Sequence, residues 1–241
     1  MHRILSLHAG KPKARDDGSK RGRLSARKRS PAAVRKAKRD DPLSTILASG
    51  ALARLATHFA IRPDEATHLR GLQRATGLAP RSLQTELVRL GELGVIQREA
   101  SGRQVRYRVN EQSPRWRLVR ELVRELADPT DVVRDALSDV PGLEAAFLFG
   151  SMARGTQIRE GSDIDLFVLR GELAEDRLAR RTIDAGVLLK REVNPVVMGA
   201  EELRDHVSKE SGFLRAVLKE PKRWVVGDER ALHSALAGQA E

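Results

Sequence analysis

Residues 145–168 have the sequence AAFLFGSMARGTQIREGSDIDLFV, which decides the fold of the C-terminal part of the chain. The apolar run before Gly150 is typical of a buried strand, and Gly150 with Ser151 predicts a turn into a helix. Asp163 and Asp165 lie two residues apart on the next predicted strand, so their carboxylates share one face. Carboxylates are hard oxygen ligands that suit Mg²⁺, and without a cation the two would repel each other. The pair therefore predicts a metal site.

Composition excludes several classes of protein. The chain has 241 residues, enough for one to two domains, and 40% of them are hydrophobic. It has no Cys, which excludes disulfides, Cys-ligated zinc and thiol nucleophiles and fits a reducing, cytoplasmic location. The longest uncharged stretch, 42–53, has 12 residues and is too short to cross a bilayer. We expect a cytoplasmic protein without a signal peptide and without a membrane partner.

The net charge of +11 is unevenly distributed. Residues 1–40 hold 14 Lys and Arg against 3 Asp and Glu, the middle block 41–127 is mildly basic, and the block 128–241 is mildly acidic. The basic block has few large apolar side chains, so we expect a disordered tail. Such a tail attracts nucleic acid phosphate, which predicts association with the nucleoid. A solubilising tail and an upstream extension are the alternatives.

The middle block has the periodicity of helices followed by a hairpin. The spacing predicts one amphipathic helix from Leu43 to before Pro63, a short helix over 66–75, and after a Gly-containing turn a helix over 80–93. This helix-turn-helix order would place the last helix in the major groove of DNA. The alternating pattern of 95–109 predicts a hairpin behind it. The residues expected to contact DNA are Arg81, Ser82, Gln84, Thr85 and Arg89 on the helix, and Arg103, Arg106 and Arg108 on the hairpin.

Residues 43–110 resemble the winged helix domain of ArsR-like bacterial transcription regulators. The segment LRGLQRATGLAPRSLQTELVRLGELGVIQREASGRQVRYRVN is similar to that family's helices and wing in order and spacing. The resemblance implies sequence-specific binding of double-stranded DNA as a homodimer. The absence of Cys, and of His pairs at ligand spacing, excludes the family's usual thiolate metal sensing. A winged helix used only for protein contacts is the alternative.

The segment first quoted resembles the DNA polymerase beta-like nucleotidyltransferases, especially their minimal prokaryotic members. Their pattern G-S-x-A-R-G followed by S-D-I-D-L is matched in full, with eleven residues between Ser151 and Asp163. The resemblance implies that Gly150 and Ser151 cradle the triphosphate of an NTP and that Asp163 and Asp165 hold two Mg²⁺ ions. Arg154 could contact phosphate, or form a surface ion pair.

One position departs from that family. A third carboxylate normally stands on the next strand, and our register places it at or near Asn194, an amide that can serve neither as a base nor as a strong metal ligand. Glu192 lies two residues earlier on the same face and could substitute. A solvent-exposed strand end is the alternative for Glu192.

We therefore expect an α/β (α+β) protein in which a winged helix precedes a small nucleotidyltransferase domain with a mixed sheet. The predicted function is DNA binding combined with transfer of a nucleoside monophosphate from an NTP to a hydroxyl. A transcription regulator with a degenerate, nucleotide-sensing domain is the alternative, and modification of a partner toxin is a third hypothesis. The predicted divisions are a tail at 1–40, a winged helix domain at 41–112, a linker helix at 113–130 and a nucleotidyltransferase domain at 131–241.

Overall fold

The first predicted helix is two helices in the computed structural model, which describes residues 42–102, 104–155, 162–209 and 212–238. Helix α1 (Pro42–Ile46) ends before Ala48, whose φ of 52° is left-handed and stops helical hydrogen bonding. Helix α2 (Gly50–Ile61) then begins at Ser49, whose side chain accepts from the backbone N–H of Leu52 at 3.1 Å. The prediction of one continuous helix was wrong because this cap was overlooked. The predicted tail and Arg103 lie outside the described residues.

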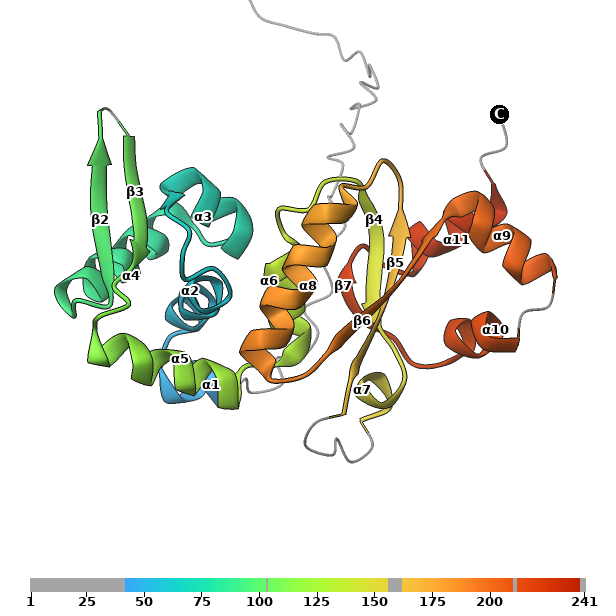
Figure 1. Ribbon diagram of the computed structural model, residues 1–241, viewed down its shortest axis with the longest axis horizontal. Helices are drawn as coiled ribbons and strands as arrows, with labels where there is room; N and C mark the ends of the chain where they lie inside the picture. The colour runs from blue at the N-terminus through green and yellow to red at the C-terminus, as the bar shows by residue number, and fades with distance from the viewer. Residues whose placement is uncertain (1–41, 103, 156–161, 210–211, 239–241) are drawn as a thin grey trace, which may run out of the picture. The chain divides into compact units, whose positions relative to one another are not determined.

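A helix-turn-helix and a hairpin follow in the expected order (Figure 1). The turn between the two helices is made by Gly77, whose φ of 64° suits a residue without a Cβ. The hairpin strands pair with each other and with a short third strand, so that the antiparallel sheet has the order β1-β3-β2. The elements are β1 (Thr67–His68), α3 (Leu69–Thr76), α4 (Pro80–Glu92), β2 (Ile96–Ser101) and β3 (Gln104–Val109).

Two helices connect this part of the chain to a second sheet. Helix α5 (Pro114–Leu126) begins at a proline, as its sequence predicts. Helix α6 (Pro129–Leu137) is capped by Asp128, which accepts from the backbone N–H of Thr130 at 2.8 Å.

The second sheet is mixed and has the order β6-β5-β4-β7. Strands β5 and β6 are parallel, and helix α8 makes the crossover between them, whereas β4 pairs antiparallel with both β5 and β7. This agrees with the expected fold class. The elements are β4 (Leu143–Leu148), α7 (Ser151–Arg154), β5 (Ile164–Arg170), α8 (Glu175–Leu189), β6 (Val193–Gly199), α9 (Ala200–Ser208), α10 (Gly212–Lys219), β7 (Arg223–Val226) and α11 (Glu229–Ala237).

Helices cover both faces of this sheet, and alternate residues of each strand point to opposite faces. Leu166 and Val168 pack on the side of α6 and α8, and that cluster of buried side chains continues into α2. Phe147 and Phe167 stack at 4.9 Å on the side of α9, α10 and α11. Figure 1 shows the two sets of helices on opposite sides of the strands. Asp165 has the parity of Phe167, so it belongs to the face that α10 covers.

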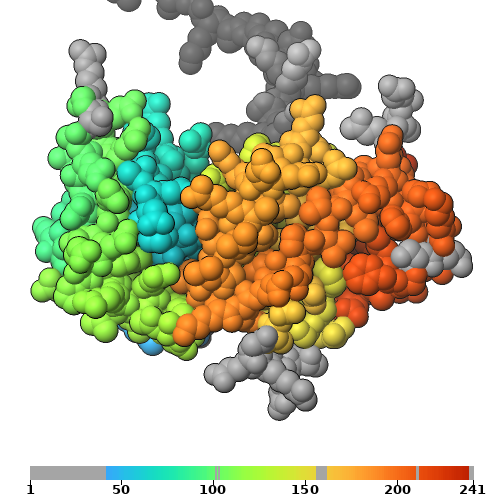
Figure 2. Space-filling model, in the orientation of Figure 1, coloured from blue at the N-terminus to red at the C-terminus, as the bar shows by residue number. Residues whose placement is uncertain are grey.

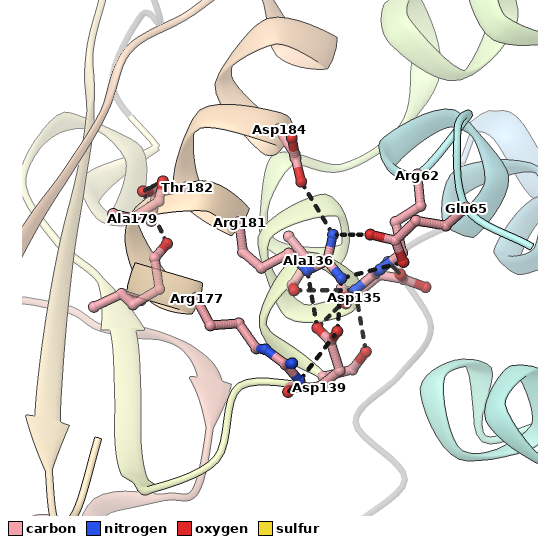
Figure 3. A network of polar contacts seen from close by, with 12 residues as sticks. Arg62, Glu65, Asp135, Ala136, Asp139, Arg177, Ala179, Arg181, Thr182 and Asp184 are labelled. Carbon is pink, nitrogen blue, oxygen red and sulfur yellow. Dashed lines mark hydrogen bonds and ion pairs between the residues drawn. The ribbon is translucent and has the colours of Figure 1, made fainter. Parts of the chain in front are cut away.

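A buried ion pair joins the end of α2 to α6, and a partly exposed one joins the loop after α2 to α8 (Figure 3). Arg62, 4% exposed, donates to the carboxylate of Asp135 and, at 3.0 Å, to the carbonyl of Ala136. Arg181 donates to Glu65 at 2.8 Å and to Asp139 at 2.7 Å. In Figure 2 the orange surface of α8 lies directly against the cyan surface of the N-terminal helices. All described residues accordingly fall in one compact unit.

No helix among the described residues is both long and apolar enough to cross a membrane. The domain divisions expected from the sequence stay a prediction.

Candidate active site

The backbone at Gly150 lies against the carboxylate of Asp165. Gly150 has φ 65° and ψ −140°, and a Cβ added there would stand 2.6 Å from Oδ2 of Asp165. The backbone N–H of Phe149 also donates to the carbonyl of Asp165 at 3.1 Å. The turn after β4 is therefore held beside the start of β5, and a side chain at position 150 would strain the backbone and displace the Asp165 carboxylate.

The two aspartates occupy the beginning of β5. Asp165 is the second residue of the strand and half-buried, whereas Asp163 directly precedes the strand and is exposed. Burial raises the pKa of Asp165, the Asp163 carboxylate raises it further, Arg154 opposes the increase, and Glu220 adds to it. The two carboxylates are thus electrostatically coupled, as their spacing predicted.

Glu220, at the end of α10, is a site residue that sequence reasoning missed. Its Oε1 accepts from Nη1 of Arg154 at 2.7 Å, and its charge acts on Asp165. Arg154 is thus in an ion pair, which was the alternative given for it from the sequence. No local motif could reveal Glu220, because it lies 66 residues from Arg154 in the chain.

Arg191 is a second residue that the sequence analysis did not single out. It donates to the side chain of Ser162 at 2.9 Å, approaches the carbonyl of Asp163 at 3.5 Å and contacts the sulfur of Met152 at 3.3 Å. Burial lowers the pKa of Arg191, and the Asp163 carboxylate opposes that decrease. Arg191 therefore ties the segment before β5 to helix α7.

The parallel pairing of β5 with β6 places Asn194 directly beside Asp165. This register agrees with the one expected from the sequence, and paired residues of parallel strands present their side chains to the same face. Glu192 stands just before β6, is exposed, and accepts the backbone N–H of Ile164 at 2.8 Å through its carbonyl. Its carboxylate makes no ion pair with any described residue.

A divalent cation fits the chemistry of the Asp163 and Asp165 pair. Burial and then the Asp163 carboxylate raise the pKa of Asp165, and a cation beside the two carboxylates would relieve the repulsion between them. Within the described ranges, no group of three or more His, Cys, Asp or Glu is arranged to hold a metal ion. Asp163 and Asp165 are thus the two carboxylates at this place that could hold a cation.

Among the described residues, those expected to contact DNA lie on the outer face of α4 and on β3. All five residues predicted on the helix are exposed, while Leu83, Leu87 and Leu90 on its other face are buried. On β3, Arg106 is exposed and donates to His68 at 3.2 Å, and Arg108 pairs with Glu99 at 3.4 Å. The helix residues are Arg81, Ser82, Gln84, Thr85 and Arg89.

Residues 132–221 match the family model described as Polymerase beta, Nucleotidyltransferase. The match includes β4 to β6, the turn at Gly150, both aspartates and Glu220. It identifies this segment as a nucleotidyltransferase domain, and it supports nucleotidyl transfer as the general class of activity. No match was found among the curated proteins.

Proposed function

We propose that this protein transfers a nucleoside monophosphate from an NTP to an acceptor hydroxyl, and that its N-terminal part binds double-stranded DNA. The observation that carries the transfer reaction is the contact between the Gly150 backbone and the Asp165 carboxylate. It brings a turn suited to phosphate and a carboxylate suited to a cation into direct proximity, inside a segment that matches a nucleotidyltransferase family.

Each site residue has a role in this proposal. The backbone N–H groups at Gly150 and Ser151 bind the triphosphate, and Asp163 and Asp165 hold two Mg²⁺ ions. The ions would neutralise the developing charge on the phosphates and orient the acceptor. The phosphate of the NTP competes with Glu220 for Arg154, which would then donate a forked pair of hydrogen bonds to the substrate.

The reaction also requires a proton acceptor. The hydroxyl oxygen forms a bond to the α-phosphorus, the bond from that phosphorus to the bridging oxygen breaks, and pyrophosphate leaves. The hydroxyl proton must pass to a base, and Asn194 cannot take it because an amide is not basic. Glu192 is our proposed base, and Gln substitution at Glu192 should lower turnover more than Gln substitution at Glu220.

The test is transfer of label from each α-³²P NTP, with Mg²⁺ or Mn²⁺, into protein and RNA of a cell extract. We expect label with the wild type and none with Asp163→Ala. Equal labelling by both proteins would refute the role of the aspartates. Labelled protein of one size would favour a partner such as a toxin as the acceptor.

A second candidate function is supported by the position of Asn194. An amide beside Asp165 suits a domain that binds a nucleotide without catalysing its transfer. Nucleotide binding would then alter the affinity of the N-terminal part for DNA. In that case no label transfers, and nucleotide changes the affinity for DNA in the wild type but not in Asp163→Ala.

The DNA-binding proposal is supported by the exposed basic face of α4. Arg81→Ala should weaken binding to a selected operator by about 1–3 kcal/mol and leave binding to random DNA nearly unchanged. Arg117→Ala, an exposed arginine on α5, is the matched control. Equal losses on both DNAs would reject α4 as the recognition helix. Deleting residues 1–40 should make the affinity for DNA depend less steeply on salt concentration. Sedimentation would test the proposed homodimer.

A further inference from the structure

Helix α8 carries an apolar stripe on its outer side. Its inner side packs into the protein, where Leu178, Ala185 and Leu188 are buried. Ile183 and Val187, one turn apart, are instead 64% and 62% exposed. In Figure 1 helix α8 lies in front of α6 and the mixed sheet, and in Figure 2 no other element among the described residues covers its outer surface. The core of the described chain therefore does not account for these two side chains.

Helix propensity does not account for Ile183 and Val187 either. Both are β-branched, and on an exposed helix face such residues are poorer helix formers than Ala, Leu or Lys. In water they also gain no free energy from burial. An apolar stripe that neither the core nor the helix itself favours is typical of a surface that packs against a partner.

The stripe is symmetrical about Ile183. Ala179 and Val187 lie four residues to either side of it, and Asp176 and Lys190 lie seven residues to either side. These spacings return to one side of a helix, and all five residues are exposed. A second copy of α8 that runs antiparallel, about a two-fold axis at Ile183, therefore presents the same stripe in reverse order.

The two ends of the stripe have opposite charge. In the antiparallel arrangement Asp176 of each copy lies against Lys190 of the other, so two ion pairs flank the apolar centre. Neither side chain forms an ion pair or hydrogen bond with another residue in the described part of the chain. The same arrangement sets the N-terminal end of each helix dipole beside the C-terminal end of the other. A parallel arrangement would instead bring like charges together.

The sizes of the side chains are complementary as well. Ala179 of one copy would lie against Val187 of the other, and Ile183 against its own counterpart. A small residue opposite a large one lets two helices interdigitate at an axial distance of about 8–10 Å. Arg180, which flanks the stripe, would lie opposite Gly186, where no side chain blocks it.

We propose that a second copy of this chain binds the outer face of α8, and that the homodimer forms through this antiparallel pair of helices. The inference rests on the homodimer proposed above. It assigns the interface to the segment that matches the nucleotidyltransferase family and not to the N-terminal helices. It is independent of nucleotidyl transfer and of DNA binding.

Sedimentation velocity of the full chain over a series of concentrations measures the Kd of the dimer. Ile183→Asp places a charge at the centre of the helix pair, and we expect it to raise that Kd by about tenfold or more. The matched control is Leu118→Asp on α5, where the leucine is 67% exposed. The control should change Kd by less than about twofold.

Two outcomes of this measurement would overturn the proposal in different ways. If Leu118→Asp dissociates the dimer and Ile183→Asp does not, the homodimer exists but its interface lies on α5. If the wild type stays monomeric at every concentration, the homodimer itself is refuted.

Exchange of charge tests the antiparallel pairing. Asp176→Lys makes both ends of the stripe positive, and Lys190→Asp makes both ends negative, so each variant alone should have a Kd about fivefold higher or more at low salt. Asp tolerates the left-handed backbone at position 190, and circular dichroism would confirm that both variants fold.

A mixture of these two variants should associate as a heterodimer with a Kd close to that of the wild-type dimer, because every end of one stripe then meets the opposite charge. If the mixture associates no more tightly than each variant alone, the pairing of Asp176 with Lys190 is wrong and the proposed interface is overturned.

Discussion

At the scale of single residues, Gly150 constrains the candidate active site most tightly. Its backbone angles lie in a region that side chains avoid, and its Cα faces the Asp165 carboxylate. Gly150→Ala should therefore lower the free energy of unfolding by about 1–3 kcal/mol.

The matched control is Gly155→Ala, which has a φ of 66° but no atom within 4 Å of the added Cβ. Gly155→Ala should lower the free energy of unfolding by about 1 kcal/mol, because only the left-handed backbone conformation is unfavourable for alanine there. Urea denaturation would compare the two variants, and equal losses would mean that neither the contact with Asp165 nor the ψ of −140° at Gly150 adds to the cost of a positive φ.

Asp165 provides a prediction on pH. Its pKa is raised by burial and by Asp163, so the folded state holds the proton more tightly than the unfolded state does. That contribution to stability is complete below the ordinary carboxyl pKa and is lost as the pH rises through the folded pKa. Asp165→Asn should raise Tm at pH 7 by roughly 1–3 °C, and the gain should vanish near pH 3. A gain of equal size at both pH values would exclude this electrostatic origin.

At the scale of elements, Asp135 on α6 holds the end of α2. It receives hydrogen bonds from Arg62, which is itself buried, and faces His58. Asp135→Ala leaves the Arg62 charge buried without its partner and should cost about 3–5 kcal/mol, measured by urea denaturation.

Asp131 on the same helix supplies the control. Its partner Arg134 is exposed, so Asp131→Ala should cost less than about 1 kcal/mol. Replacing the buried pair together, by Arg62→Met with Asp135→Leu, should recover most of the loss. Equal effects of the two alanine variants would show that burial of the pair is unimportant.

The elements also show how far sequence reasoning reaches. The strands around Gly150, a helix within 113–130 and the register of Asn194 were predicted because alternation, capping and motif spacing are local signals. Glu220 and Arg191 were missed because tertiary packing alone brings them near the aspartates. The break at Ala48 was missed because helical spacing continues across it while the backbone does not.

At the scale of the whole molecule, the buried cluster runs without interruption from α2 through α6 to α8. Separating the N-terminal helices from the mixed sheet would divide this cluster and leave the buried Arg62 without its partner Asp135. We expect residues 42–238 to unfold in one cooperative transition, with equal calorimetric and van't Hoff enthalpies. Two resolved transitions in scanning calorimetry would mean that the two parts fold independently.

The pairing of Asp165 with Asn194 has an evolutionary consequence. Asn and Asp have nearly the same shape, so a carboxylate at position 194 requires no repacking of β6 against β5. Their codons differ by a single nucleotide. A single point mutation would therefore place a third carboxylate beside Asp163 and Asp165. Selection can add or remove the negative charge at position 194 without changing the fold.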